Sequence, residues 1–230
     1  MEAAQAREAD SDNLSAWKLN VLSLQLAGRL AAAEEEVVTA LKRFSGDADL
    51  WFYQARVQYL QFEFKNAGQS ARKAIQLDPK HADAHTQLGM ILEAQQEFAG
   101  ALTYYVRSIE LNREQRRSLT LPMVKAGQLL SKLGRMSEAL EQFTSAEIVD
   151  PRSSEIHLER ARVLERLARI REAESEYEQA VAIDGNKLAR SHLERIRAGA
   201  AAGKPAASGT SPAAGRGQGI AQPPTTSRDM

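Results

Sequence analysis

A spacing of 34 residues recurs along most of this 230-residue chain and restricts its fold more than any other feature of the sequence. Trp17 and Trp51 are 34 residues apart, and so are Phe64 and Phe98. A fixed spacing of this length is typical of proteins that stack one small structural unit many times. We therefore expect a repeat protein whose core forms between neighbouring units.

The spacing predicts five units with one interruption. Gly89 and Gly127 are 38 residues apart, so four extra residues lie in the connection between units three and four, within 113–119. The predicted units are residues 14–47, 48–81, 82–115, 120–153 and 154–186. Because each unit alone leaves an apolar face bare, the stack needs polar ends. The amphipathic segment 187–198 is the expected C-terminal capping helix.

Each unit is expected to form two helices joined by a short turn. In unit three, Leu88, Ile91 and Leu92 make one apolar stripe with helical spacing, and a second stripe begins at Phe98. Polar residues 95–97 separate the two stripes, and the matching turn in unit two is predicted at residues 65–66. No segment alternates convincingly with a period of two, so the predicted fold class is all-α.

Small residues recur in the middle of the first helix of the units, although glycine costs about 1 kcal/mol relative to alanine in a helix. They are Ala55, Gly89, Gly127 and Ala161. Because this loss of helix stability recurs in several units, we expect it to be offset by close packing of the paired second helix against the small residue.

These residues in register resemble tetratricopeptide repeats, most specifically at Gly89, Phe98, Ala101, Gly127, Ala139 and Pro151. Unit one departs most, because Val21 stands at the small position and Ser45 at the proline position. The resemblance implies a right-handed α-solenoid of about five helical hairpins. It also implies that the first helices line a concave ligand groove.

A mixed strip, aromatic at one end and basic toward the other, is expected along that groove. The expected lining residues are Phe52, Tyr53, Arg56, Tyr59, Gln87, Met90, Lys125, Gln128, Arg162 and Arg166. Such a strip suits an extended peptide or a helix that offers apolar anchors and carboxylates, so an acidic protein partner is compatible with it. The alternative is that Phe52 and Tyr59 pack between repeats and that the charges are simply solvated.

Some members of the family hold a C-terminal carboxylate with Lys and Asn at fixed places on successive first helices. The corresponding positions here are Lys18, Leu22, Tyr53, Asp83 and Gln87, and only the lysine is retained. A chaperone-tail adaptor is therefore not expected.

The sequence offers no convergent set of reactive groups, so we expect no enzyme activity, no cofactor and no metal site. There is no cysteine. The one suggestive histidine pair is His81 and His85, but His81 falls in a turn between repeats and His85 takes the position of Trp51. Interface packing is the favoured role of His85.

Charge and hydropathy patterns limit the partners further. Lys and Arg together number 30 and Asp and Glu together number 30, so no global field draws the chain to nucleic acid. No apolar run is long enough to cross a membrane, and the polar start has no secretory signal, so a cytoplasmic location is the default and a periplasmic one requires a removed leader. Residues 1–13 are expected to be flexible, and 199–230, rich in Gly, Ala, Ser and Pro, to be disordered.

The sequence thus favours a non-catalytic scaffold that binds a peptide or helix of another protein. The alternative is a regulatory or targeting subunit of a larger assembly, such as bacterial envelope, pilus or secretion machinery. The partner, its affinity and the oligomeric state do not follow from the residues.

Overall fold

The computed structural model describes residues 13–115, 117 and 119–202, which form eleven helices and no strand. The helices are α2 (Leu14–Leu26), α3 (Leu30–Arg43), α4 (Ala48–Leu60), α5 (Phe64–Leu77), α6 (Ala82–Ala94), α7 (Phe98–Glu114), α8 (Leu121–Lys132), α9 (Met136–Val149), α10 (Ser154–Arg166), α11 (Ile170–Asp184) and α12 (Lys187–Ala202).

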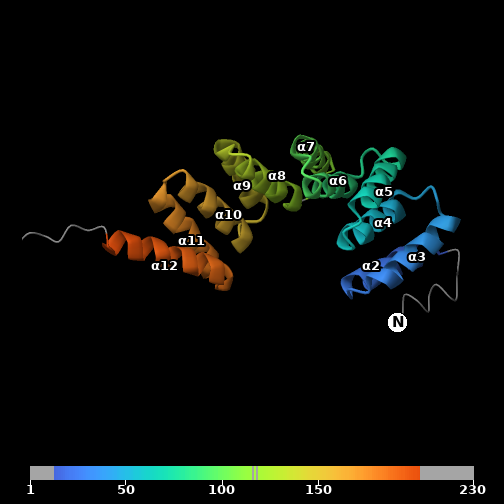
Figure 1. The fold of residues 1–230 in the computed structure, drawn as a ribbon, viewed down its shortest axis with the longest axis horizontal. Coiled ribbons are helices and arrows are strands. Elements are labelled where there is room, and N and C mark those ends of the chain that lie inside the picture. The colour runs from blue at the N-terminus through green and yellow to red at the C-terminus, as the bar shows by residue number, and fades with distance from the viewer. Residues whose placement is uncertain (1–12, 116, 118, 203–230) are drawn as a thin grey trace, which may run out of the picture.

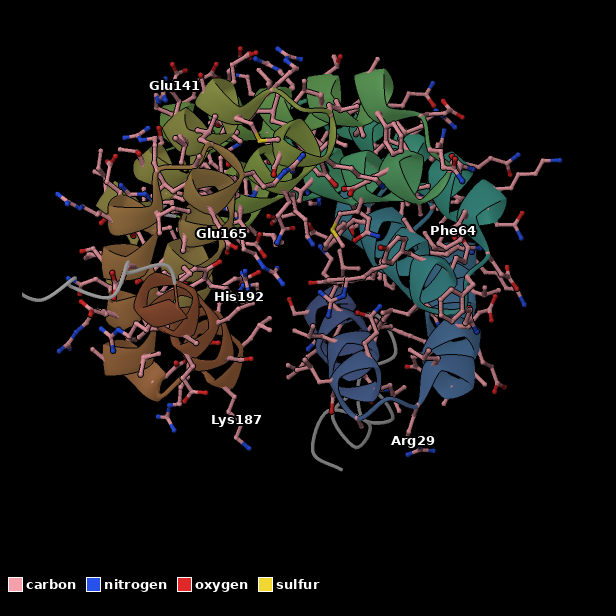
Figure 2. The ribbon with its side chains drawn as sticks, turned by 60° about the vertical axis from the view of Figure 1, so that its left-hand side comes forward. Arg29, Phe64, Glu141, Glu165, Lys187 and His192 are labelled. Carbon is pink, nitrogen blue, oxygen red and sulfur yellow. The ribbon has the colours of Figure 1, made fainter. Side chains whose placement is uncertain are left out.

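Consecutive helices pair into five hairpins, from α2 with α3 to α10 with α11, and α12 packs against α11. The hairpins stack side by side into an arch with α2 at one foot and α12 at the other (Figure 1). Figure 2 shows the same arch from another side, with Glu165 of α10 toward its inside and Glu141 of α9 toward its outside. The predicted all-α solenoid is confirmed.

Local residue chemistry explains where several helices begin and end. The side chain of Asn13 accepts a hydrogen bond from the amide of Ala16 at 3.1 Å, and that of Asp47 accepts one from Leu50 at 2.9 Å. Both satisfy an amide that has no partner within its helix. Gly185 ends α11 with a φ of 71°, a left-handed conformation that glycine adopts without steric cost.

The small mid-helix residues pack as expected. A Cβ added to Gly89 would lie 2.7 Å from the Tyr105 ring, and one added to Gly127 would lie 2.7 Å from the Phe143 ring. Each of these rings belongs to the second helix of the same hairpin. The second helix therefore approaches through an aromatic ring, and the glycine makes the space for it.

Three boundaries differ from those predicted. Residues 65–66 lie inside α5, because the turn of unit two is at 61–63 and the polar pair simply faces solvent. Part of the four-residue insertion extends α7, which has 17 residues where α5 has 14, and its added residues, 112–114, include the buried Asn112. Residues 199–202 belong to α12 and not to the predicted tail, since alanine is the strongest helix former.

The predicted flexible segment 1–13, apart from Asn13, and the remaining tail, 203–230, lie outside the described residues.

Candidate functional site

The inside of the arch holds a cavity of about 600 Å³, which we call the central cavity. Residues from four first helices surround it, so it lies between hairpins and not within one. They are Leu22 of α2, Phe52, Tyr53, Arg56, Tyr59 and Leu60 of α4, Asp83, Thr86, Gln87 and Met90 of α6, and Leu121 of α8.

Helix α4 contributes the aromatic part of this cavity. Its residues 52, 53, 56 and 59 share one face because they are spaced by about one helical turn. The rings of Phe52 and Tyr53 lie 5.4 Å apart, and Phe52 also lies 5.2 Å from the His81 ring of the next unit. Burial, with Asp49 nearby, raises the pKa of the Tyr53 hydroxyl, so this group stays a neutral hydrogen-bonding group.

Helix α6 contributes an amide and a thioether. Gln87 is 5% exposed, and its Nε2 is buried with no hydrogen-bond partner among the described residues. Met90 is half-buried beside it and lines the cavity. An unpaired carboxamide at a cavity wall is suited to a ligand that brings its own polar atoms.

A second cavity, of about 590 Å³, adjoins the first, because Tyr59 and Met90 line both. We call it the side cavity, and the two cavities together the concave groove. Its other walls include Glu93, Phe98, Lys125 and Lys132. The ammonium group of Lys132 lies 4.4 Å from the centre of the Phe98 ring, and Lys125 Nζ is 3.4 Å from Gln128 Oε1.

The charges of the concave groove do not balance internally. Arg56, Lys125 and Lys132 outnumber the two carboxylates of the groove, Glu93 and Asp83. Asp83 pairs with Arg117 at 2.9 Å, while Glu93 accepts from the neutral Tyr105 hydroxyl at 2.8 Å and keeps its charge. Within the described part of the chain, neither Arg56 nor Lys125 has a carboxylate partner. The groove therefore presents a positive charge beside aromatic rings.

The structure brings seven of the ten predicted groove residues to the two cavities and places three outside them. Gln128 contacts Lys125 but lines neither cavity. Arg162 pairs with Glu159 at 3.0 Å, and Arg166 donates to the Ser131 carbonyl at 2.7 Å. These two arginines thus have partners within the solenoid.

The alternative role of Phe52 and Tyr59, packing between repeats, applies to only part of what these side chains do. Both side chains are half-buried and line the groove, but only Phe52 makes a ring contact with the next unit, at His81, whereas the ring contact of Tyr59 is with Phe64 of the same hairpin. The predicted set of lining residues left out several residues of the two cavities, among them Leu22, Leu60, Leu121 and Lys132. Helical spacing could have found three of them, since Leu60 follows Phe52 by two turns, Leu121 precedes Lys125 by one, and Lys132 follows it by two.

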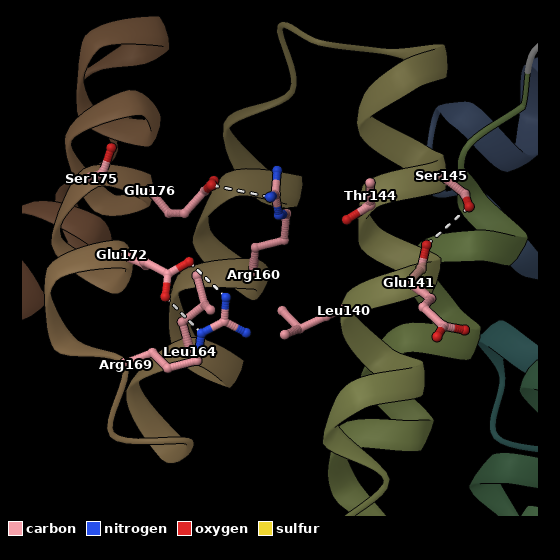
Figure 3. A pocket seen from close by; sticks show the side chains of 10 residues that line it. All are labelled: Leu140, Glu141, Thr144, Ser145, Arg160, Leu164, Arg169, Glu172, Ser175 and Glu176. Carbon is pink, nitrogen blue, oxygen red and sulfur yellow. Dashed lines mark hydrogen bonds and ion pairs between the residues drawn. The ribbon is translucent and has the colours of Figure 1, made fainter.

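A third cavity, of about 660 Å³, opens on the outer side between the second helices α9 and α11, with Arg160 and Leu164 of α10 at its base (Figure 3). Its cations are already paired, since Arg169 contacts Glu172 and Arg160 contacts Glu176 and Glu147. No sequence feature pointed to this cavity, and its lining leaves no unpaired cation for a ligand.

The two histidines with suggestive spacing have other partners. His81 Nε2 lies 3.0 Å from Asp49, and its Nδ1 accepts from the amide of Ala84. His85 Nε2 lies 3.1 Å from the Pro79 carbonyl oxygen, in the packing role that the sequence favoured. In the part of the chain that the structure describes, no group of three or more His, Cys, Asp or Glu is placed to hold a metal ion.

None of the described helices is long and apolar enough to cross a membrane.

The architecture and the register of small residues agree with a family comparison. Residues 18–82, 63–115 and 124–187 match the model of the tetratricopeptide repeat. This chain belongs to the tetratricopeptide repeat family. The matched residues include all five hairpins in whole or in part, and proteins with this repeat act generally as protein-interaction scaffolds.

Curated relatives are similar over part of their length. The chain is 28% identical over 151 residues to a DnaJ homolog subfamily C member 7 homolog of Schizosaccharomyces pombe, covering 60% of this chain and 32% of that protein. It is 27% identical over 114 residues to a probable biofilm formation methyltransferase, WspC, of Pseudomonas putida, covering 50% of this chain and 27% of that one. The chain thus spans about a third or less of these relatives.

Solved structures share the tetratricopeptide fold. YrrB, described as a TPR protein with an unusual peptide-binding site, superposes with a TM-score of 0.62 at 20% identity, over 85% of this chain and 98% of that one. Pseudomonas aeruginosa PilF superposes with a TM-score of 0.71 at 20% identity, over 88% and 90%.

Proposed function

We propose that this tetratricopeptide protein is a non-catalytic scaffold that binds a peptide or helix of a partner protein in its concave groove. The observation that carries the proposal is the pair of half-buried cations, Arg56 and Lys125, that lie beside aromatic rings and have no carboxylate partner in the described structure. Aromatic and arginine side chains dominate the energy of protein interfaces.

The same arrangement favours an acidic partner. A carboxylate on the bound segment would give Arg56 or Lys125 the counter-charge that the fold does not supply, while apolar side chains would cover Phe52, Tyr59 and Met90. The unpaired amide of Gln87 would bind the main chain or a polar side chain of that segment. The peptide-binding site named for YrrB gives this proposal a precedent within the same fold.

The test is selection of 16-residue peptides from a random phage-displayed library on the wild-type protein, followed by fluorescence polarisation. Arg56→Glu with Lys125→Glu should weaken the selected peptides at least tenfold, because two attractive charges become repulsive. The matched control is Arg72→Glu with Arg171→Glu, an equal charge change at exposed positions on second helices. If both double variants bind the peptides with equal affinity, the binding surface lies outside the concave groove.

A second candidate is a regulatory or targeting subunit of a multi-protein assembly. It is supported by the likeness to part of a protein named as a methyltransferase, because a repeat domain of this kind can sit beside a catalytic partner. Affinity capture from cells with mass spectrometry tests it. Recovery of one stoichiometric enzyme would favour this candidate over a general scaffold.

A further inference from the structure

One residue in the turn of unit two has an unusual backbone conformation for its type. The turns inside the five hairpins each place one residue in the left-handed region, namely Gly28, Phe62, Gln96, Gly134 and Ala168. Glycine adopts this conformation without steric cost, whereas a bulky side chain is strained there. Phe62, with a φ of 65°, is the bulkiest of the five.

Burial does not compensate for this strain. The Phe62 side chain is 78% exposed, and its ring contact is an edge-on one with Phe64 at 6.1 Å. Phe64, labelled in Figure 2, in turn lies 5.6 Å from Tyr59 of the concave groove. Three rings therefore run from the groove across the α4–α5 turn to the surface. Neither conformation nor packing explains a phenylalanine at position 62.

The edge of the groove next to this turn is apolar at one end and basic at the other, as the groove itself is. The first helices of the five units end, in order, at Leu26, Leu60, Ala94, Lys132 and Arg166, which we call the turn rim. Leu60 is 42% exposed and lines the central cavity, and Lys132 lines the side cavity. Both cavities therefore reach this rim.

We propose that the partner segment held in the concave groove leaves it across the turn rim, with a large apolar side chain packed on Phe62 and Leu60 and a carboxylate near Lys132. This inference rests on the proposed function. The contacts from Tyr59 through Phe64 to Phe62 connect the groove with Phe62, which lies two residues beyond the rim residue Leu60, and the charge of Lys132 matches the acidic segment that Arg56 and Lys125 favour. The occupant is thus the same acidic peptide, longer by one apolar residue beyond the groove.

The test uses Phe62→Gly. Glycine fits a φ of 65°, so the melting temperature of this variant should rise, while its affinity for the 16-residue peptides selected on wild type should fall at least tenfold. A purely structural side chain would instead lower the melting temperature when removed. The control is Ala168→Gly at the same turn position of unit five, which should leave peptide affinity within twofold of wild type.

The outcomes separate this inference from the proposed function. If Phe62→Gly binds within twofold of wild type, or melts below it, the rim contact is wrong even where Arg56→Glu with Lys125→Glu abolishes binding. If Phe62→Gly weakens binding and the double charge variant does not, peptides contact Phe62 without using the groove, so both the proposed function and the path from groove to rim are wrong. A library that yields no peptide for the wild type overturns both.

Discussion

At the scale of single residues, the helix glycines are the most direct link between sequence and packing. Gly127→Ala should lower the free energy of unfolding by about 1–3 kcal/mol, because the new Cβ would meet the Phe143 ring at 2.7 Å and overpack the hairpin. Urea denaturation at neutral pH measures this difference.

Gly68→Ala is the matched control for that substitution. It is also a buried glycine within a helix, but its added Cβ would meet the end of the flexible Arg72 side chain at 3.3 Å. The arginine can move aside, and the gain in helix propensity, up to about 1 kcal/mol, should leave stability unchanged or slightly higher. Equal losses for the two variants would show that the loss at Gly127 does not come from the contact with Phe143.

Protonation of His85 should make the free energy of unfolding depend on pH. Burial lowers the pKa of its imidazole below the ordinary 6.5, although the hydrogen bond to the Pro79 carbonyl opposes the shift. With Nε2 facing that carbonyl, a second proton would go to Nδ1, which is buried without a hydrogen-bond partner. The unfolded chain therefore binds this proton more readily than the folded protein does.

The sign of the effect follows from proton linkage. Below pH 6.5 the unfolded state takes up more protons at His85, so the free energy of unfolding should fall as the pH drops from 7.5 to 5.5. His85→Gln should show a smaller loss over the same range, since every other titrating group is retained. Equal slopes of unfolding free energy against pH for the two proteins would contradict the assignment.

At the scale of helices, the sequence predicted most of the fold because each helix repeats the same constraint. The spacing of small and large residues fixed the order of the hairpins, and the one-turn spacing of Phe52, Arg56 and Tyr59 predicted a shared face that the structure brings to one cavity. The insertion was harder to place. The inserted residues could form either a loop or an added turn of α7, and only the burial of Asn112 distinguishes the two.

The remaining site features depend on contacts between helices, which the repeat pattern does not specify. Arg166 occupies a predicted groove position, but it donates to Ser131, 35 residues earlier in the chain. The positive φ of Phe62 likewise follows from the length of the α4–α5 turn, since its side chain alone would disfavour that conformation. Spacing therefore predicts which face a residue is on, and tertiary packing decides whether its charge is already paired.

At the scale of the whole molecule, the buried apolar residues that the structure describes form three clusters and not one. The largest joins units two to five, from Ala55 to Val163, while a smaller one joins units one and two around Val21, and another joins unit five to α12. In a stacked repeat protein each unit is stabilised by its neighbours, so units at the ends have fewer stabilising interfaces. Opening should therefore begin at the ends of the arch.

Two core truncations test this order of opening. Leu129→Ala, in the central cluster, should cost about 2–5 kcal/mol and speed amide hydrogen exchange in α6 to α9 and beyond, because units on both sides lose an interface. Val21→Ala, equally buried in the end cluster, should speed exchange in α2 and α3 while α6 to α9 keep wild-type protection. If both variants speed exchange equally in all helices, the arch unfolds as one cooperative unit. The concave groove would then be lost together with the first hairpin.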